Sequence, residues 1–199
     1  TFGQGDFPFY IVSLAAFMQR KDTPGDDAWA ELREAQAHTT RTVPNSGLAL
    51  AIDLGDANDI HPKDKKEVGE RLALCALAKH YGRKIPSFGP TFASAEPLPG
   101  SLKLHFQHAD GGLMVKGDKL AELAVAGADQ KWFWADAKIE GDTVIVSSPK
   151  VAEPKFARYA WQSNPVATLF NGAGLPASIA ASMSSIVGRS NGLRPATIS

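Results

Sequence analysis

Residues 48–62 read LALAIDLGDANDIHP, and this stretch decides the fold class that we expect for the chain. It opens with Leu48–Leu54, a run that is apolar except for Asp53. Runs that are apolar throughout, rather than alternating, are typical of parallel strands covered on both faces. Pro62 predicts the start of a helix, because proline is favoured at the first helical position. A strand, a polar loop and a helix in succession indicate an α/β layered sheet.

The same alternation of strand and helix extends to either side of this stretch. Phe7–Leu14 is an earlier apolar, aromatic and β-branched run that predicts another buried strand. A helix is expected between the two runs, from about Asp27 to Arg41, with Asp26 or Asp27 as its N-cap. A second helix is expected from about Pro62 to Tyr81. Two strands do not make a whole sheet, so we expect further strands to come from elsewhere.

The composition changes near residue 85, and the following region is typical of an all-β module. Leu102, Leu104 and Phe106 alternate with polar residues, and Asp110–Gly112 predicts a hairpin turn. Several short strands with turns between them predict a β-sandwich. Further strands are expected at Leu113–Val115, Leu123–Ala126, Trp132–Trp134, Val144–Val146 and Phe156–Trp161.

We therefore divide the chain into three parts. Residues 1–85 form an α/β region, residues 86–178 a β-rich module, and residues 179–199 an irregular tail. The segment from Gly172 onward is rich in Ala, Ser and Gly, which predicts an extended or partly disordered chain.

The amino-acid composition of the chain argues against two classes of binding partner, nucleic acids and membranes. The 21 Lys and Arg residues equal the 21 Asp and Glu residues, so the chain lacks the basic excess of a nucleic-acid-binding protein. No apolar run reaches the roughly 18 residues that a transmembrane helix needs, so no membrane partner is expected. The single cysteine, Cys75, excludes an internal disulfide and is predicted to be a core thiol.

The candidate chemistry lies between Asp53 and His61. In open α/β sheets, active sites lie at the carboxyl ends of the strands, which is where this loop follows its predicted strand. The loop holds three carboxylates, one amide and one imidazole within nine residues: Asp53, Asp56, Asn58, Asp59 and His61.

His61 is the candidate general base. If Pro62 begins the helix, His61 is its N-cap, where the helix dipole disfavours the imidazolium ion. A nearby carboxylate would offset that effect and fix the tautomer, as a base that takes and returns a proton requires. Asp59 and Asp53 are the candidate orienting acids. The alternative is structural, because Asp and Asn before a helix are common turn formers.

The sequence IDLGDANDIHPKDKKEVGERLALCALAKHYG, from Ile52 to Gly82, closely resembles the signature of the sialate O-acetylesterase family, a branch of the SGNH hydrolases. Upstream, GDFPFYIVSLAAF and AWAELREAQ are similar to the same family. Downstream, HADGGLMVKG, AGADQKWFWADAKIEGDTVIVSS, RYAWQSNP and LFNGAGLPAS resemble its β-rich C-terminal part. The resemblance covers roughly residues 1–178 in order, and several separate blocks carry it.

The resemblance implies the C-terminal part of a flavodoxin-like three-layer α/β/α hydrolase domain, joined to a β-sandwich-like module. It implies a carbohydrate O-acetylesterase that hydrolyses acetyl esters on sugars by a Ser-His-Asp mechanism, with no metal or organic cofactor. It carries over His61 as the base and places the acid in the same loop. The general SGNH pattern has the acid three residues before the His, where Asn58 stands here, so Asp59 is favoured and Asp53 is next. Because the family is usually exported, the resemblance also implies a periplasmic, extracellular or lysosomal location.

The nucleophile that this mechanism needs is not found in the sequence. The family's serine lies in a Gly-Asp/Glu-Ser block, and Ser13, Ser46 and Ser87 have no such context. The oxyanion-hole Gly and Asn blocks are also not found. We therefore expect the serine to come from a missing N-terminal segment or a partner chain. Two alternatives stay open: a non-catalytic carbohydrate-binding module that uses Trp132 and Trp134, and an interaction fragment with an idle catalytic loop.

Overall fold

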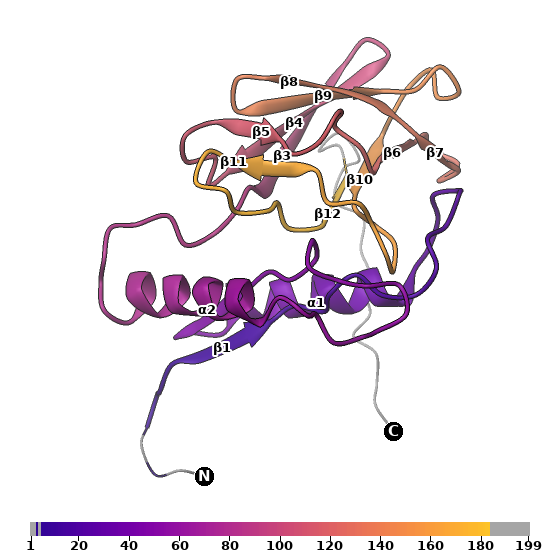
Figure 1. Ribbon diagram of the computed structural model, residues 1–199. Coiled ribbons are helices and arrows are strands. Elements are labelled where there is room, and N and C mark those ends of the chain that lie inside the picture. Colours follow the sequence, from indigo (N-terminus) through magenta and orange to yellow (C-terminus); the bar gives the residue numbers. More distant parts are fainter. Residues whose placement is uncertain (1–2, 4, 184–199) are drawn as a thin grey trace.

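The computed structural model describes residue 3 and residues 5–183 of the 199-residue chain (Figure 1). Within these residues the fold is mixed α/β, with two helices and four small sheets. An α/β layer, at the bottom of Figure 1, lies against a larger β-rich part above it. The α/β layer contains β1 (Phe9–Val12), α1 (Ala28–Thr42), β2 (Ser46–Ala49) and α2 (Lys65–Lys79).

The two strands of the α/β layer are parallel, as the apolar runs predict. Phe9 is paired with Ser46 at one end and Val12 with Ala49 at the other. The predicted span of the second strand, Leu48–Leu54, is wrong. The strand ends at Ala49, and the chain then turns, with the Leu54 amide donating to the Ala51 carbonyl at 3.0 Å.

The apolar residues beyond β2 are buried by a different contact. Ile52 is 1% exposed and belongs to the core cluster of the β-rich part, together with Leu102, Leu123 and Val144. The run is therefore apolar because it packs under another layer, and this burial does not require an extended strand.

The helices begin where side-chain caps are available. The Asp27 carboxylate caps α1 by accepting from the amides of Trp29 and Ala30, both at 3.0 Å. In α2 the N-cap is Asp64, whose carboxylate accepts from the Glu67 amide at 3.0 Å. The predicted start at Pro62, with His61 as N-cap, is therefore wrong. An aspartate is a much stronger N-cap than a histidine, so the helix starts later and the dipole argument does not apply to His61.

The outer edge of β2 is closed by one face of α2. The carbonyls of Asn45 and Ala49 accept from β1, so the alternate carbonyls of Ser46, Leu48 and Leu50 point the other way. Each of these three accepts a hydrogen bond from α2. The donors lie one turn apart: Lys79 Nζ to Ser46 at 2.6 Å, Cys75 Sγ to Leu48 at 3.5 Å, and Arg71 Nη1 to Leu50 at 2.6 Å. This edge is therefore not available to another strand.

The β-rich part contains two antiparallel four-stranded sheets and one antiparallel pair. Leu102, Leu104 and Phe106 point inward and are buried, as their alternation predicts. The first sheet, in order, is β3 (Thr91–Leu98), β4 (Ser101–Gln107), β9 (Thr143–Ser147) and β8 (Asp136–Glu140). The second is β12 (Ala180–Met183), β10 (Phe156–Tyr159), β6 (Leu123–Ala126) and β7 (Trp132–Trp134), and the pair is β11 (Leu169–Asn171) with β5 (Leu113–Val115).

Two expectations for this part need correction. The turn at Asp110–Gly112 forms, but β5 after it pairs with β11 rather than with β4, so there is no hairpin. The tail predicted to be irregular includes strand β12, which pairs with β10, and Leu175, Ala177 and Ile179 before it are buried. The burial of these apolar side chains and the pairing with β10 order the segment, which composition alone does not reveal. Residues 184–199 of the predicted tail lie outside the described residues.

A buried arginine joins the two parts of the molecule. Arg33 on α1 is 2% exposed and donates to the carbonyls of Leu14, Ala15, Gln162 and Ser163, at 2.7–2.9 Å. Burial lowers the pKa of this guanidinium to about 10, against the opposing effect of Asp27. The group therefore stays charged at neutral pH and holds the loop after β1 against the segment after β10.

Candidate active site

Two consecutive side-chain turns shape the loop between β2 and α2. The Asp56 carboxylate accepts from the Asn58 amide at 2.9 Å, and the Asp59 carboxylate accepts from the His61 amide at 2.9 Å. Such turns are the ordinary local preference of aspartate. They direct the chain from the C-terminal end of β2 toward α2, and they bring the Asp59 carboxylate next to the His61 ring.

The His61 ring contacts Asp59 directly. Nδ1 of His61 lies 3.2 Å from Oδ1 of Asp59, and the His61 side chain is 80% exposed. We assign the proton to Nδ1 because its neighbour is a carboxylate, which leaves Nε2 as the free, solvent-facing base. The hydrogen bond from the His61 amide, followed by the one from its ring, lowers the pKa of Asp59 and keeps it ionised.

Asp53 occupies a different environment. Its two carboxylate oxygens accept from Nη1 and Nη2 of Arg71, at 2.6 and 2.8 Å. Both side chains are almost fully buried, and Arg71 also donates to Glu67 at 2.9 Å. Of the two candidate acids, Asp59 is therefore the one next to His61, while Asp53 forms a buried bidentate ion pair that joins β2 to α2.

Hydrogen bonds to the loop after β1 hold the loop between β2 and α2 in place. The Met18 amide donates to the Ala57 carbonyl at 3.1 Å, and Asn164 Nδ2 donates to the Met18 carbonyl at 2.7 Å. Lys63 Nζ binds the Asp56 carboxylate at 2.9 Å. Sequence reasoning did not identify Met18, Lys63 or Asn164, because the partners lie up to 146 positions apart and no local pattern marks them.

Gly55 lies so close to the neighbouring loop that a side chain does not fit. A Cβ atom at this position would overlap the backbone of Ala16, including its carbonyl oxygen. We expect Gly55→Ala to shift the His61 loop, lowering stability by about 1–3 kcal/mol and the proposed esterase activity of the assembled enzyme by about 100-fold. Urea denaturation and acetate release check the two effects.

Gly69→Ala is the matched control for this substitution. Gly69 lies in α2 with open space around its Cα, so alanine there is expected to raise stability by about 0.5–1 kcal/mol. Unchanged activity in Gly55→Ala would contradict a role for this close contact in positioning the loop.

No described serine forms a hydrogen bond with the His61 ring. Ser13 Oγ accepts from the Ala51 amide at 2.9 Å, and Ser46 Oγ donates to the Val43 carbonyl at 2.6 Å. Ser87 lines a cavity that His61 does not line. Within the described part of the chain, Asp59 is the one side chain that hydrogen-bonds the His61 ring. The His61 ring is therefore largely exposed to solvent, and no serine of the described chain hydrogen-bonds it.

The tryptophans of the β-rich part are only partly available to a ligand. The Arg158 guanidinium lies 4.1 Å from the ring centre of Trp132 and 4.7 Å from that of Trp161, so it covers one face of each. Trp134 is 37% exposed, and its Nε1 donates to the Asp22 carbonyl at 2.7 Å. A sugar platform at Trp132 is disfavoured by this stacking, whereas Trp134 is partly exposed.

Comparison with known proteins finds relatives that are all named as acetylesterases. The chain is 32% identical over 178 residues to the sialate O-acetylesterase of Homo sapiens, an alignment that covers 80% of this chain and 33% of that protein. The Mus musculus sialate O-acetylesterase is 32% identical over 181 residues, with 82% and 33% covered. The crystal structure of a carbohydrate acetylesterase from Xanthomonas citri superimposes with a TM-score of 0.82 and 40% identity, covering 88% of this chain and 41% of that one.

No protein-family model matches the chain. The chain spans about a third of the length of the curated relatives that it matches. Several blocks in the loop, the helices and the β-rich part carry the resemblance noted in the sequence. That resemblance is confirmed: the chain is a homologue of the sialate O-acetylesterases.

Proposed function

We propose that this chain carries the acid–base half of a serine-type carbohydrate O-acetylesterase, which hydrolyses acetyl esters on sugars. The observation that carries the proposal is the His61–Asp59 pair, held at 3.2 Å on the loop that follows a parallel strand. The relatives support the substrate class, since their names describe sialate and carbohydrate acetylesterases. In this proposal Asp59 is the orienting acid, and Asp53 acts indirectly by anchoring the loop to Arg71.

The proposed mechanism follows from the assignment of the His61 proton to Nδ1, which leaves Nε2 able to accept a proton. A serine hydroxyl from the N-terminal portion of the enzyme attacks the acetyl carbonyl, and Nε2 of His61 takes its proton. Asp59 stabilises the imidazolium, which then gives the proton to the departing sugar oxygen. Water, deprotonated by the same nitrogen, attacks the acetyl-serine; the bond between the acetyl carbon and the serine oxygen breaks, His61 returns the proton to the serine oxygen, and acetic acid leaves and ionises to acetate. Oxyanion-hole donors from the N-terminal portion stabilise the tetrahedral intermediate by about 3–4 kcal/mol each.

One edge of β1 has no strand partner in the described chain, which supports the proposal that another portion of the protein contributes a strand to this sheet. The amides of Phe9 and Ser13 donate toward β2, so the polar groups of Tyr10 and Val12 point to the opposite edge. In the described chain β1 pairs only with β2, whose own outer edge is closed by α2. The N-terminal portion therefore adds a strand beside β1 and completes a flavodoxin-like three-layer α/β/α domain. Residues 1–85 belong to that domain, and the β-sandwich-like module predicted at 86–178 extends to include strand β12.

The test is reconstitution from two polypeptides. We expect the 199-residue chain alone to release no acetate from acetylated sugars, because it supplies a base without a nucleophile. Adding the N-terminal portion of the enzyme is expected to restore hydrolysis and to protect the amides of Tyr10 and Val12 from hydrogen exchange. Acetate measurement and exchange mass spectrometry give these two readouts.

The control is an N-terminal portion whose serine in the Gly-Asp/Glu-Ser block is replaced by alanine. It is expected to protect Tyr10 and Val12 equally while restoring no hydrolysis. Turnover by the 199-residue chain alone would contradict the divided active site. Sugar binding without hydrolysis in the reconstituted protein would favour the alternative, a carbohydrate-binding or interaction fragment that uses the partly exposed Trp134.

A location outside the cytoplasm is part of the same proposal, because the family that the sequence resembles is usually exported. Neither described helix has the length and apolar character needed to cross a bilayer.

A further inference from the structure

The loop that follows β1, residues 14–21, is held by the β-rich part of the molecule, and we call it the support loop. The Phe17 amide donates to the Ser163 carbonyl at 3.1 Å. Nδ2 of Asn164 donates to the Met18 carbonyl at 2.7 Å. Adjacent residues of the segment after β10 therefore bind adjacent residues of the support loop.

The same two segments are joined by Arg33 of α1. Its buried guanidinium donates to the carbonyls of Leu14 and Ala15 on one side, at 2.9 and 2.7 Å. On the other side it donates to the carbonyls of Gln162 and Ser163, at 2.7 and 2.8 Å. Hydrogen bonds from a charged donor are strong, and breaking them here would leave buried polar groups unpaired. The support loop and the segment after β10 therefore form one rigid unit.

Met18 has a backbone conformation that residues with side chains rarely adopt. Its φ is 72°, in the left-handed region. Such a conformation persists only where the surrounding structure holds it. Two hydrogen bonds do so: the Met18 amide donates to the Ala57 carbonyl at 3.1 Å, and the Met18 carbonyl accepts from Asn164. If Asn164 stops donating, we expect Met18 to relax and its amide to turn away from Ala57.

Ala57 connects Met18 to the loop that carries the proposed base. It follows Asp56, whose carboxylate forms the first of the two side-chain turns in that loop, and the second turn brings Asp59 next to His61. The His61 side chain is 80% exposed, so packing does little to fix it. Its position therefore depends on the backbone of its own loop, which the Met18 amide holds at Ala57.

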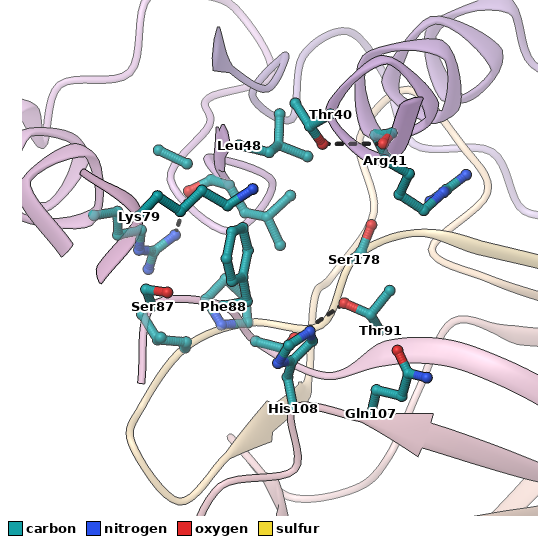
Figure 2. A pocket seen from close by; sticks show the side chains of 17 residues that line it. Thr40, Arg41, Leu48, Lys79, Ser87, Phe88, Thr91, Gln107, His108 and Ser178 are labelled. Carbon is teal, nitrogen blue, oxygen red and sulfur yellow. Dashed lines mark hydrogen bonds between the residues drawn. The ribbon is translucent and has the colours of Figure 1, made fainter. Parts of the chain in front are cut away.

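These contacts are separate from the cavity of about 320 Å³ at the seam between the α/β layer and the β-rich part (Figure 2). Gln107 at the end of β4 lines that cavity, whereas Met18, Ala57 and Asn164 do not. A substitution at Asn164 therefore changes the support loop without changing the cavity wall, and a substitution at Gln107 does the reverse.

We propose that Asn164 of the β-rich part is a positioning residue for His61. Its side-chain amide holds Met18, and the Met18 amide in turn holds Ala57 in the loop that carries His61. The β-rich part thereby acts on the proton-transfer step through the support loop. The inference rests on the proposed function, in which His61 is the general base.

Two substitutions that remove the donor test this role in the assembled esterase at neutral pH. Asn164→Asp keeps the size of the side chain, but its carboxylate only accepts hydrogen bonds, and Asn164→Leu removes the donor without adding a charge. We expect each to lower kcat by about 10- to 100-fold and to change KM by less than about twofold, because a displaced base slows proton transfer while the substrate still binds. Steady-state release of acetate from an acetylated sugar measures both constants.

Hydrogen exchange followed by mass spectrometry gives a second readout, which does not depend on activity. In both variants the amides of the support loop are expected to exchange at least about tenfold faster, while those of β10 keep their rate. The control is Gln107→Leu, which replaces an exposed amide side chain in the same β-rich part. It is expected to leave kcat and the exchange of the support loop unchanged.

The outcomes separate this inference from the proposed function. If His61→Ala were inactive while both Asn164 variants kept more than half of the kcat, the positioning role would be wrong. A loss of kcat in both variants with faster exchange across β10 would assign the effect to unfolding of the β-rich part and would also overturn it. Full activity in His61→Ala would instead overturn the proposed function, and this inference with it.

Discussion

We expect the assembled esterase to lose about four orders of magnitude in kcat when His61 is replaced by alanine. In the proposed mechanism the residue supplies Nε2 as the proton acceptor for the serine and as the proton donor for the departing sugar, and no second imidazole of the described chain hydrogen-bonds with it. KM is expected to change little, because the ring is 80% exposed and its proposed role is in proton transfer rather than in binding. Steady-state release of acetate from an acetylated sugar measures both constants.

Asp59→Asn extends this prediction to the acid. An asparagine at this position no longer carries the charge that stabilises the imidazolium, and it does not enforce the Nδ1–H tautomer. We expect a loss in kcat of about 10³- to 10⁴-fold, with the fold intact because the side chain is half-exposed.

The control for both variants is His38→Ala, on the exposed face of α1, which is expected to keep full activity. If His61→Ala kept more than a tenth of the activity, the proposed base would be wrong.

The second large effect concerns stability. Asp53→Ala leaves the Arg71 guanidinium buried, with 5% of its side chain exposed and the half-exposed Glu67 as its remaining carboxylate. Removing one partner of a buried ion pair costs about 3–5 kcal/mol, because the other charge stays desolvated. We expect a loss of that size in the free energy of unfolding, measured by urea denaturation.

Two further variants make this result specific. Lys66→Ala breaks an exposed ion pair with Glu70 on the same helix and is expected to change stability by less than about 0.5 kcal/mol. The double variant Asp53→Leu with Arg71→Met removes both charges and is expected to recover most of the lost stability. If Asp53→Ala instead lowered kcat as much as His61→Ala without loss of stability, Asp53 and not Asp59 would be the orienting acid.

Part of the candidate site could be predicted from neighbouring residues alone. Asp59 and His61 are two positions apart, and the turn that joins them is a local preference of aspartate. The choice between Asp59 and Asp53 could not be made in this way. It depends on Arg71, which lies 18 positions after Asp53 and reaches it only because α2 folds back along β2.

The boundaries of the helices and strands also divide into those set by local contacts, which could be predicted, and those set by distant contacts, which could not. The cap of α1 was predicted at Asp26 or Asp27, and Asp27 forms it; this was possible because a capping side chain acts within three residues. The end of β2 was predicted wrongly, since the apolar run that follows is buried by the β-rich part. The pairing of β5 with β11 joins segments more than fifty positions apart, and the turn between β4 and β5 contains no information about it.

The sequence by itself determined the presence of an α/β region followed by a β-rich region, the resemblance to the sialate O-acetylesterases, and the candidate base at His61. These features depend on hydrophobic periodicity and on short motifs, which act over a few residues. Tertiary structure alone decided that Asp53 pairs with Arg71 rather than with His61, and that α2 closes the edge of β2. Each of these depends on side chains from distant segments, brought together by burial of apolar surface between layers, and this burial has no local signature in the chain.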